Sequence, residues 1–197
     1  MAVDETLTPA RLTDFLAHDY RRLRLYMGEA AFIAMVRHCL AATETPKVRL
    51  LSRDLPDFLY QSKPYSRSPE LSDLARLENA FNAALSAPEA GIITRVSPQA
   101  FHLELHPSVQ RLQLRTNATS IWAALTAGEL PPPPHRLDEP QDLLVWRQGV
   151  APRFRMLGRE EAVMLDGAAR GEEVKIDQST ENFLLGWLEA EIISAVL

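Results

Sequence analysis

Three short stretches of this sequence carry residue types that could do chemistry. In "HLELH", His102, Glu104 and His106 alternate along a predicted strand and would share one of its faces. Two imidazoles and a carboxylate are ligands that zinc and iron accept. Neighbouring side chains on one strand stand too far apart to close easily on one ion. A solvated polar face therefore explains the pattern better than a metal site.

The second stretch places His38 beside Cys39, a base next to a nucleophile. Adjacent residues on a helix point about 100° apart and cannot meet, so core packing is the better explanation of Cys39. The phosphate-binding motifs GxGxxG and GxxxxGK[ST] and the hydrolase motif GxSxG are absent from the sequence. No autonomous enzyme is predicted, because a hydrolase or metalloenzyme would lack its motif.

The third stretch is "SDLARLENAF", residues 72–81, in a predicted amphipathic helix. Glu78 falls within the apolar stripe of that helix. A buried carboxylate costs several kcal/mol unless it is paired and hydrogen-bonded. The stripe consists of Leu71, Leu74, Ala75, Phe81 and Leu85. Glu78 must therefore have a structural partner, a helix end to bind, or a substrate or partner protein to face.

Arg37 is also a charge on an apolar helix stripe, so a structural ion pair between Glu78 and Arg37 is predicted. Asp73, in the same "DLARLE" block as Glu78, is the third candidate buried charge. Two alternatives stay open, because Arg22 could serve Glu78 and Asp19 could compete for Arg37.

Composition limits the class of protein. The chain has 197 residues, 46% of them hydrophobic, a formal net charge of −5 and a single cysteine. One cysteine excludes an intrachain disulfide and a multi-cysteine zinc site, and fits a reducing compartment. There is no apolar run of membrane-spanning length, and the amino terminus lacks a signal-peptide pattern. A cytoplasmic protein with no membrane partner is predicted.

A basic segment, "YRRLRLY", is the best candidate for nucleic-acid binding. Arg21, Arg22 and Arg24 on an exposed helix face could contact phosphates. A solvated helix face with one arginine turned inward is the favoured alternative. Neither half of the chain is basic, which argues against DNA as a partner.

Periodicity predicts an α+β fold in two domains. Helical patterns fill residues 9–90, including one helix over 9–26, and strands of period two follow at 100–106 and 109–115, predicted as antiparallel neighbours. Later come a helix at 119–128, an exposed proline run at 131–134, strands at 142–148 and 153–158, and helices at 159–171 and 179–197. The predicted domains are a helical 1–90 and an α+β 91–197.

Arg153 and Arg155 alternate along the second of the late strands, beside Trp146 of the first. An edge strand can accept an extended peptide through main-chain hydrogen bonds, and two arginines could meet acidic peptide residues. Arg153, Arg155 and Trp146 are therefore the candidate surface for a peptide or partner. The alternative is that both strands pair internally and Trp146 belongs to the core.

The chain resembles a bacterial family long labelled a DNA-binding domain, which includes the HvfC/BufC-type proteins. The motifs that carry the resemblance are "EAAFIAMVRHCLAATETP", "LPDFL", "SDLARLENAF", "DLLVWRQG" and "LGREEAVMLDGAARGE", in that order. They cover most of the chain, and "DLARLE" is the most specific. The resemblance implies a helical domain followed by a smaller α+β domain of winged-helix-like, peptide-recognising outline.

The resemblance also implies a function. Such proteins are accessory partners of TIM-barrel, multinuclear non-haem iron enzymes that modify cysteines in small ribosomally made peptides, often copper-binding ones. A non-catalytic adaptor that docks the enzyme and helps present the precursor peptide is therefore predicted. The iron belongs to the partner enzyme, and no cofactor is expected in this chain. The alternative is a DNA-binding transcriptional regulator that uses the winged-helix-like half.

Overall fold

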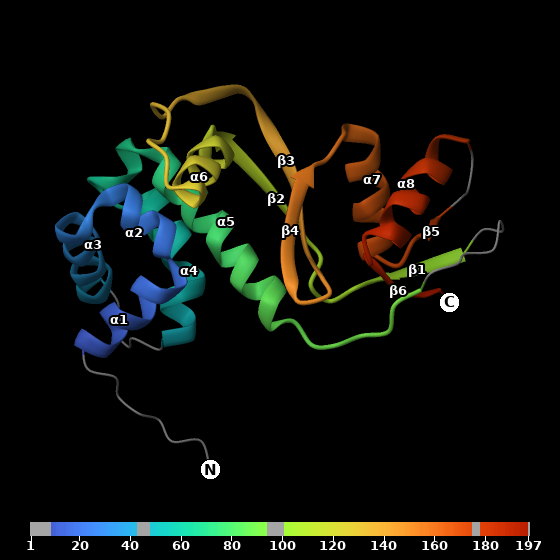
Figure 1. The fold of residues 1–197 in the computed structure, drawn as a ribbon, viewed down its shortest axis with the longest axis horizontal. Helices are drawn as coiled ribbons and strands as arrows, with labels where there is room; N and C mark the ends of the chain where they lie inside the picture. The colour runs from blue at the N-terminus through green and yellow to red at the C-terminus, as the bar shows by residue number, and fades with distance from the viewer. Residues whose placement is uncertain (1–8, 43–47, 94–100, 175–177, 197) are drawn as a thin grey trace, which may run out of the picture. The chain divides into compact units, whose positions relative to one another are not determined.

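The computed structural model describes residues 9–42, 48–93, 101–174 and 178–196 and confirms the α+β class (Figure 1). The helices are α1 (Pro9–Asp19), α2 (Arg21–Met27), α3 (Glu29–Ala41), α4 (Val48–Gln61), α5 (Pro69–Ser86), α6 (Ala118–Ala127), α7 (Arg159–Ala169) and α8 (Gln178–Glu189), with a 3-10 turn at Tyr65–Arg67. The strands are β1 (Phe101–Leu105), β2 (Gln110–Thr116), β3 (Arg136–Gln148), β4 (Ala151–Met156), β5 (Glu173–Val174) and β6 (Ile193–Val196).

The chain forms two compact units, each built from two segments. Unit 1 contains residues 1–79 and 114–140, and unit 2 contains residues 80–113 and 141–197. This division differs from the predicted single boundary at residue 90, because α6 and the proline run join the N-terminal helices. The ends of the segments fall inside α5, β2 and β3, so these three elements each contribute residues to both units.

Unit 1 is a helical cluster in which α1 packs on α2, α3 and α4, and α2 contacts α6. Its buried side chains include Leu12, Leu16, Tyr20, Leu23, Phe32, Met35, Leu55, Leu59, Leu74 and Leu77. The single helix predicted over 9–26 is wrong in one respect, since the helix is interrupted at Tyr20, where α2 begins anew. Tyr20 is fully buried, and its side chain bonds to α4.

The bond from Tyr20 replaces a helical hydrogen bond that a proline in α4 cannot make. Pro56 lies inside α4 and has no N–H to donate to the carbonyl of Ser52, four residues earlier. The Tyr20 hydroxyl donates to this carbonyl instead. The hydroxyl of Ser52 donates to Asp19 at 2.8 Å, and the hydroxyl of Ser72 on α5 donates to the carbonyl of Pro56 at 2.8 Å. The irregular turn of α4 is therefore held from both α1 and α5.

Two three-stranded sheets have the strand orders β5-β1-β6 and β2-β3-β4. The prediction that 100–106 and 109–115 are neighbouring strands is wrong, because β1 pairs antiparallel with β5 and β6, while β2 pairs with β3. A period of two shows which side chains share a face but does not identify the partner strand.

Unit 2 packs α7 and α8 with β1 around one apolar cluster. The cluster contains Leu103, Leu144, Trp146, Leu157, Ala162, Leu165, Ala168, Val174, Leu184, Trp187, Ile192 and Ile193. The predicted strands at 142–148 and 153–158 form most of the hairpin β3–β4, whose two-residue loop starts at Gly149 with a φ of 57°. A glycine suits this position because φ is positive there.

The carboxy-terminal helix is shorter than the predicted 179–197. It ends at Glu189, and Glu191 takes a positive φ of 59° before the chain enters β6. Ile192 and Ile193 are fully buried, and β-branched residues favour a strand here. Within the described ranges, no helix has both the length and the apolar composition required to cross a bilayer.

Candidate functional site

Glu78 on α5 binds the beginning of another helix. Its Oε1 accepts the backbone N–H of Arg22 at 2.8 Å, and its Oε2 accepts that of Leu23 at 2.9 Å. Because the chain is interrupted at Tyr20, these N–H groups lie in the first turn of α2, where a helix has no internal acceptors. Glu78 is therefore a helix-end ligand, one of the predicted alternatives, and its side chain is buried.

Asp73, on the same helix, binds the backbone at the end of β2. Its Oδ2 accepts the N–H of Arg115 at 2.8 Å, and both the N–H and the hydroxyl of Thr116 at 2.9 Å. The guanidinium of Arg76 lies 3.8 Å from its other oxygen. Asp73 is 3% exposed, so these donors replace nearly all of its hydration. The carboxylate fixes the junction between β2 and α6.

The predicted pair between Glu78 and Arg37 is wrong. Arg37 is exposed on α3, so it is not a buried charge. The helix face that carries Arg37 is exposed or half-buried, and the first turn of α2 supplies the donors to Glu78. The nearest cation to Glu78 is Arg22, whose Nη1 lies 3.9 Å from Oε1.

Burial is the largest influence on the pKa of Glu78. Removal from water raises the pKa of this carboxyl above its ordinary value of 4.5, and the hydrogen bonds from Arg22 and Leu23 oppose that rise only in part. A raised pKa is a property that some catalytic acids share. Here both oxygens already accept backbone hydrogen bonds, so the carboxylate is engaged in holding the fold.

Two of the three arginines proposed for phosphate contact are engaged within unit 1. Arg22 stacks over the ring of Trp122 at 4.3 Å and donates to Thr126 at 2.8 Å. Arg24 pairs with Glu29. Arg21 is exposed, and no bond to it is recorded within the described part of the chain. The helix therefore does not present three free arginines to a phosphate backbone.

The candidate peptide surface on β4 is only partly open. Arg155 makes a two-pronged ion pair with Glu161 on α7, one contact being 2.7 Å, and Trp187 donates its indole N–H to the same carboxylate at 2.7 Å. Trp146 is 6% exposed and belongs to the core of unit 2, so its proposed role as a surface contact is wrong. Arg153 is exposed and lies opposite Trp146 in the hairpin.

Glu161 is a buried charge that the sequence reasoning missed. Burial acts to raise its pKa, but the bonds from Arg155 and Trp187 together outweigh burial and lower it below 4.5. A signal was present in the sequence, because Glu161 lies on the same helical stripe as Leu165 and Ala168. That is the pattern that drew attention to Glu78.

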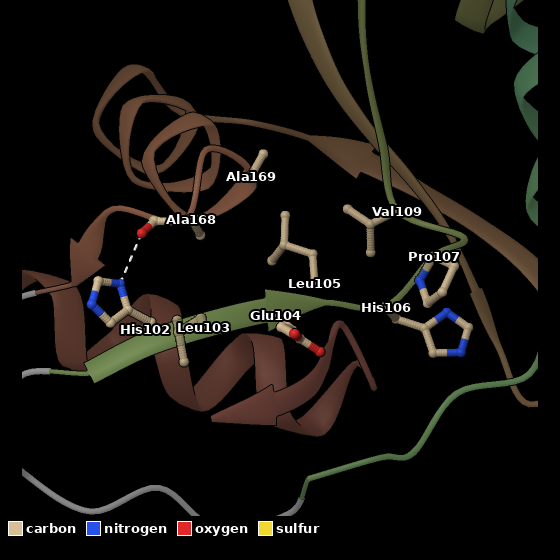
Figure 2. Close-up of a pocket in the computed structure, with 10 residues that line it drawn as sticks. His102, Leu103, Glu104, Leu105, His106, Pro107, Val109, Ala168 and Ala169 are labelled. Carbon is tan, nitrogen blue, oxygen red and sulfur yellow. Dashed lines mark hydrogen bonds between the residues drawn. The ribbon is translucent and has the colours of Figure 1, made fainter. Parts of the chain in front are cut away.

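A hollow of about 530 Å³ runs along β1 and contains the predicted "HLELH" residues (Figure 2). His102 is exposed and bonds through Nδ1 to the carbonyl of Gly171 at 2.8 Å, while Glu104 is exposed nearby. His106 lies beyond a register shift at Glu104/Leu105 and is buried. The alternation that would put all three on one face is therefore broken. Among the described residues, no group of three or more metal-ligating side chains is found.

His106 and Ser108 form a buried pair that resembles a catalytic dyad only in composition. The Nδ1 of His106 lies 2.8 Å from the hydroxyl of Ser108 and accepts the backbone N–H of Ser108 at 3.2 Å. The same hydroxyl accepts the N–H of Arg147 at 3.0 Å. Burial, followed by the charge of Arg147, lowers the pKa of His106. Ser108 has no exposed surface, so the pair holds the turn between β1 and β2.

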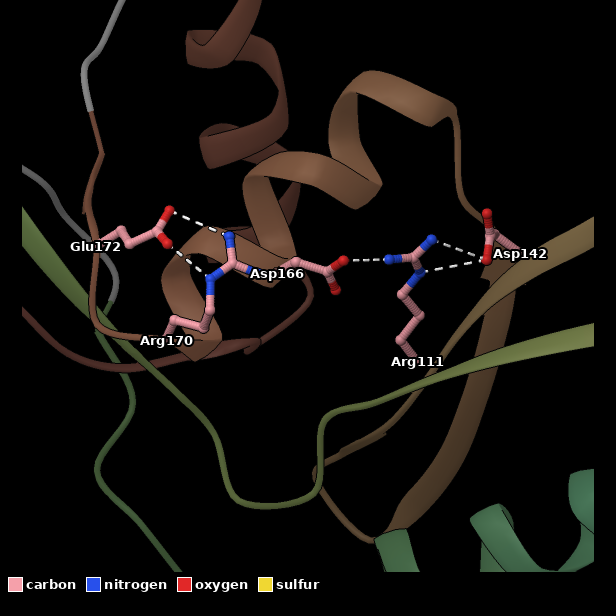
Figure 3. Close-up of polar contacts among 5 residues, drawn as sticks. All are labelled: Arg111, Asp142, Asp166, Arg170 and Glu172. Carbon is pink, nitrogen blue, oxygen red and sulfur yellow. Dashed lines mark hydrogen bonds and ion pairs between the residues drawn. The ribbon is translucent and has the colours of Figure 1, made fainter.

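Ion pairs on the surface of unit 2 connect three of its elements (Figure 3). Arg111 at the start of β2 lies 3.0 Å from Asp142 on β3 and also pairs with Asp166 on α7. Arg170 and Glu172 pair at 2.6 Å after α7. Water screens exposed pairs of this kind, so they contribute little to stability. Arg111 links α7 to the hairpin, and with Asp142 and Asp166 it lines a hollow of about 340 Å³.

Fold and contacts together define an α+β protein in which buried acidic side chains hold backbone N–H groups and internal cations. No protein-family model matches the chain, and a search of curated proteins found no match. The family resemblance of the sequence motifs stays a prediction.

Proposed function

We propose that this protein is a non-catalytic adaptor that docks a TIM-barrel, multinuclear non-haem iron enzyme and helps present a ribosomally made precursor peptide for cysteine modification. The resemblance of the sequence motifs suggests the partners. The observation that carries the peptide-binding part is the position of β4 at the edge of the sheet β2-β3-β4. An edge strand offers main-chain hydrogen bonds to an extended peptide.

The register of the hairpin tells which backbone groups point outward. Gln148 pairs with Ala151 across the two-residue loop, and hydrogen-bonded and non-bonded pairs alternate from there. Pro152, Phe154 and Met156 fall at positions whose backbone groups face away from β3. The N–H of Arg147, opposite Pro152, donates to Ser108 on the far side, in agreement with this register.

The open edge is short. Pro152 has no N–H to offer, and the carbonyl of Met156 already accepts a bond from Arg155 at 3.2 Å. The N–H of Met156, the carbonyl of Pro152 and the backbone groups of Phe154 lie on the side that a peptide strand would meet. Few main-chain bonds mean modest affinity, so side chains must contribute the rest. Arg153 supplies an exposed cation at this strand, whereas Arg155 is paired with Glu161.

The proposal is tested by titrating a cysteine-containing candidate precursor peptide with an acidic leader into the full-length protein. Met156→Pro removes the outward N–H at an exposed position, and Met156→Ala is the matched control that keeps it. We expect the proline variant to bind at least about tenfold more weakly than the alanine variant. Equal affinity of the two variants, both folded by circular dichroism, would refute strand addition at β4.

The charge at Arg153 is tested in the same titration. Arg153→Glu should weaken binding of an acidic leader, and Arg159→Glu is the control, because Arg159 is also exposed but lies on α7. Arg155→Glu is unsuitable, since it would leave Glu161 buried without its cation.

Enzyme docking is tested separately, by analytical ultracentrifugation of this protein with a candidate TIM-barrel, multinuclear non-haem iron enzyme. The adaptor function predicts a complex of defined stoichiometry at micromolar concentrations. If neither enzyme nor peptide binds, while a defined DNA site binds at nanomolar concentration in physiological salt, the protein is a regulator instead.

A further inference from the structure

The segment between α6 and β3 presents an unusual surface. It reads "LPPPPHR" from Leu130 to Arg136 and belongs entirely to unit 1. Leu130 is 93% exposed, Pro133 and Pro134 are exposed, and the first two prolines are half-buried. We propose that residues 130–136 form a docking ligand for a partner protein that has an aromatic-lined groove with a carboxylate at its end.

The backbone of this segment is restricted by its own covalent structure. Each proline ring fixes φ near −65°, and a residue that precedes a proline is excluded from the helical region. Four prolines in succession therefore favour the extended polyproline II helix, with about three residues per turn. Aromatic-lined grooves bind such chains because their prolines lose little entropy on binding.

Asn117 pins the far end of the run to the start of α6. Its side-chain Nδ2 donates to the carbonyl of Pro133 at 3.1 Å, and its Oδ1 accepts the N–H of His135 at 2.9 Å. Its backbone N–H donates to the carbonyl of His135 at 3.2 Å. Asn117 is itself buried, so three bonds hold the segment against a rigid base. A free linker would not be fixed in this way.

The side chains repeat with the spacing that such grooves read. Leu130-Pro131 and Pro133-Pro134 are two apolar-proline pairs three residues apart, and a three-residue turn places them on the same side of the chain. Arg136 follows two residues after the second pair and is exposed. Within the described ranges no ion pair to Arg136 is recorded. A cation at the end of the run selects for an acidic residue beside the partner's groove.

The bonds from Asn117 fix the backbone of this segment but do not use its exposed side chains. A leucine that is 93% exposed adds nothing to the core, and leaving it in water next to exposed prolines has a cost in solubility. Docking through this segment is independent of strand addition at β4, since that strand belongs to unit 2.

The test uses a purified SH3 domain as the probe, chosen from a panel for its binding to the free peptide of residues 129–137. It is titrated into the full-length protein by isothermal calorimetry. We expect the intact protein to bind at least as tightly as the free peptide, because Asn117 pre-orders the segment. Pro131→Ala/Pro134→Ala should weaken binding at least about tenfold, and Arg136→Glu should weaken it in a salt-dependent way.

Two controls match these variants. Pro88→Ala/Pro140→Ala changes two exposed prolines elsewhere, and Arg159→Glu reverses an exposed arginine elsewhere, so both should bind as the wild type does. The inference fails if no member of the panel binds the free peptide. It also fails if the intact protein does not bind a probe that the peptide binds, or if the double proline variant, folded by circular dichroism, binds unchanged.

Discussion

Glu78 shows at the scale of one residue how a buried carboxylate can be structural. Each of its oxygens accepts one backbone N–H from the first turn of α2. Negative charge is also favoured there by the partial positive charge of a helix N-terminus. A capping carboxylate normally comes from the chain just before the helix. Here it comes from α5, more than fifty residues later in the chain. One side chain therefore caps the helix that begins after Tyr20 and also connects α2 to α5.

Removal of Glu78 should therefore destabilise the protein. In Glu78→Ala the N–H groups of Arg22 and Leu23 lose their acceptor, and the expected loss in the free energy of unfolding is about 2–4 kcal/mol. Urea unfolding followed by circular dichroism measures it. Glu172→Ala is the control, because Glu172 is a surface carboxylate beside Arg170. Equal midpoints for the two variants would show that Glu78 does not hold α2.

The pH dependence of stability should have opposite signs at Glu78 and Glu161. Folding raises the pKa of Glu78 through burial, so its contribution is fully present below 4.5 and is lost as pH rises through the folded pKa. Folding lowers the pKa of Glu161 despite burial, through the bonds from Arg155 and Trp187. Its contribution is therefore present above 4.5 and is lost as pH falls through the folded pKa.

The measurement is the urea midpoint from about pH 3 to about pH 8 for the wild type, Glu78→Gln and Glu161→Gln. The wild type should lose its advantage over Glu161→Gln on the acid side, below 4.5. Its difference from Glu78→Gln should shift against the wild type as pH rises above 4.5. Parallel profiles for all three proteins would contradict both assignments.

At the scale of elements, the irregularity of α4 and the interruption between α1 and α2 are one feature. Pro56 deprives the Ser52 carbonyl of its helical donor, and Tyr20, at the point where α1 gives way to α2, supplies a hydroxyl to that carbonyl. The desolvation that accompanies this burial raises the pKa of the Tyr20 phenol, so it remains a donor.

This coupling can be measured with a double-mutant cycle. Tyr20→Phe should cost about 1–3 kcal/mol in the wild type, because a buried carbonyl loses its donor. In a Pro56→Ala background, the restored N–H of residue 56 can serve the Ser52 carbonyl, so Tyr20→Phe should cost less, with a coupling of about 1 kcal/mol. Additive effects of the two substitutions would show that Tyr20 does not compensate for Pro56.

The sequence predicted much at this scale, and its failures have physical causes. The helical stripe correctly identified Glu78 as a buried carboxylate, because burial follows from the period of the helix. It could not identify the partner, since the donors are backbone groups exposed by an interruption at Tyr20 that no residue type announces. The sequence suggests Arg37 because it shares a helix face with Ile33 and several alanines, but that face of α3 is exposed or half-buried. The buried face of α3 is formed by Phe32, Met35, Val36 and Cys39.

The β-elements show a similar limit. The predicted late strands 142–148 and 153–158 do pair with each other, and these partners are close in sequence. The partners of β1 are distant in sequence, and one of them, β6, was hidden in a run of apolar residues that continues the pattern of α8. Local periodicity does not record which distant strand completes a sheet.

At the scale of the whole molecule, each compact unit needs two segments of the chain. Residues 1–90 lack α6 and the Thr116 backbone that Asp73 binds. We expect a 1–90 fragment to unfold without a sharp transition, and a 1–140 fragment, which contains both segments of unit 1, to retain one. Thermal unfolding followed by circular dichroism decides this. A 1–90 fragment that melts as sharply as the 1–140 fragment would show that the N-terminal helices suffice.

The central claim is that Asp73 and Glu78 of α5 are anchors, each for its own backbone site. Native-state hydrogen exchange of the full-length protein, read at the amides of Leu23 and Thr116, tests it most directly. Both amides should be protected in the wild type. Glu78→Ala should reduce protection of Leu23 by at least about tenfold and affect Thr116 much less, and Asp73→Ala should do the reverse. Unchanged protection at both amides, or equal loss at both in either variant, would contradict the account.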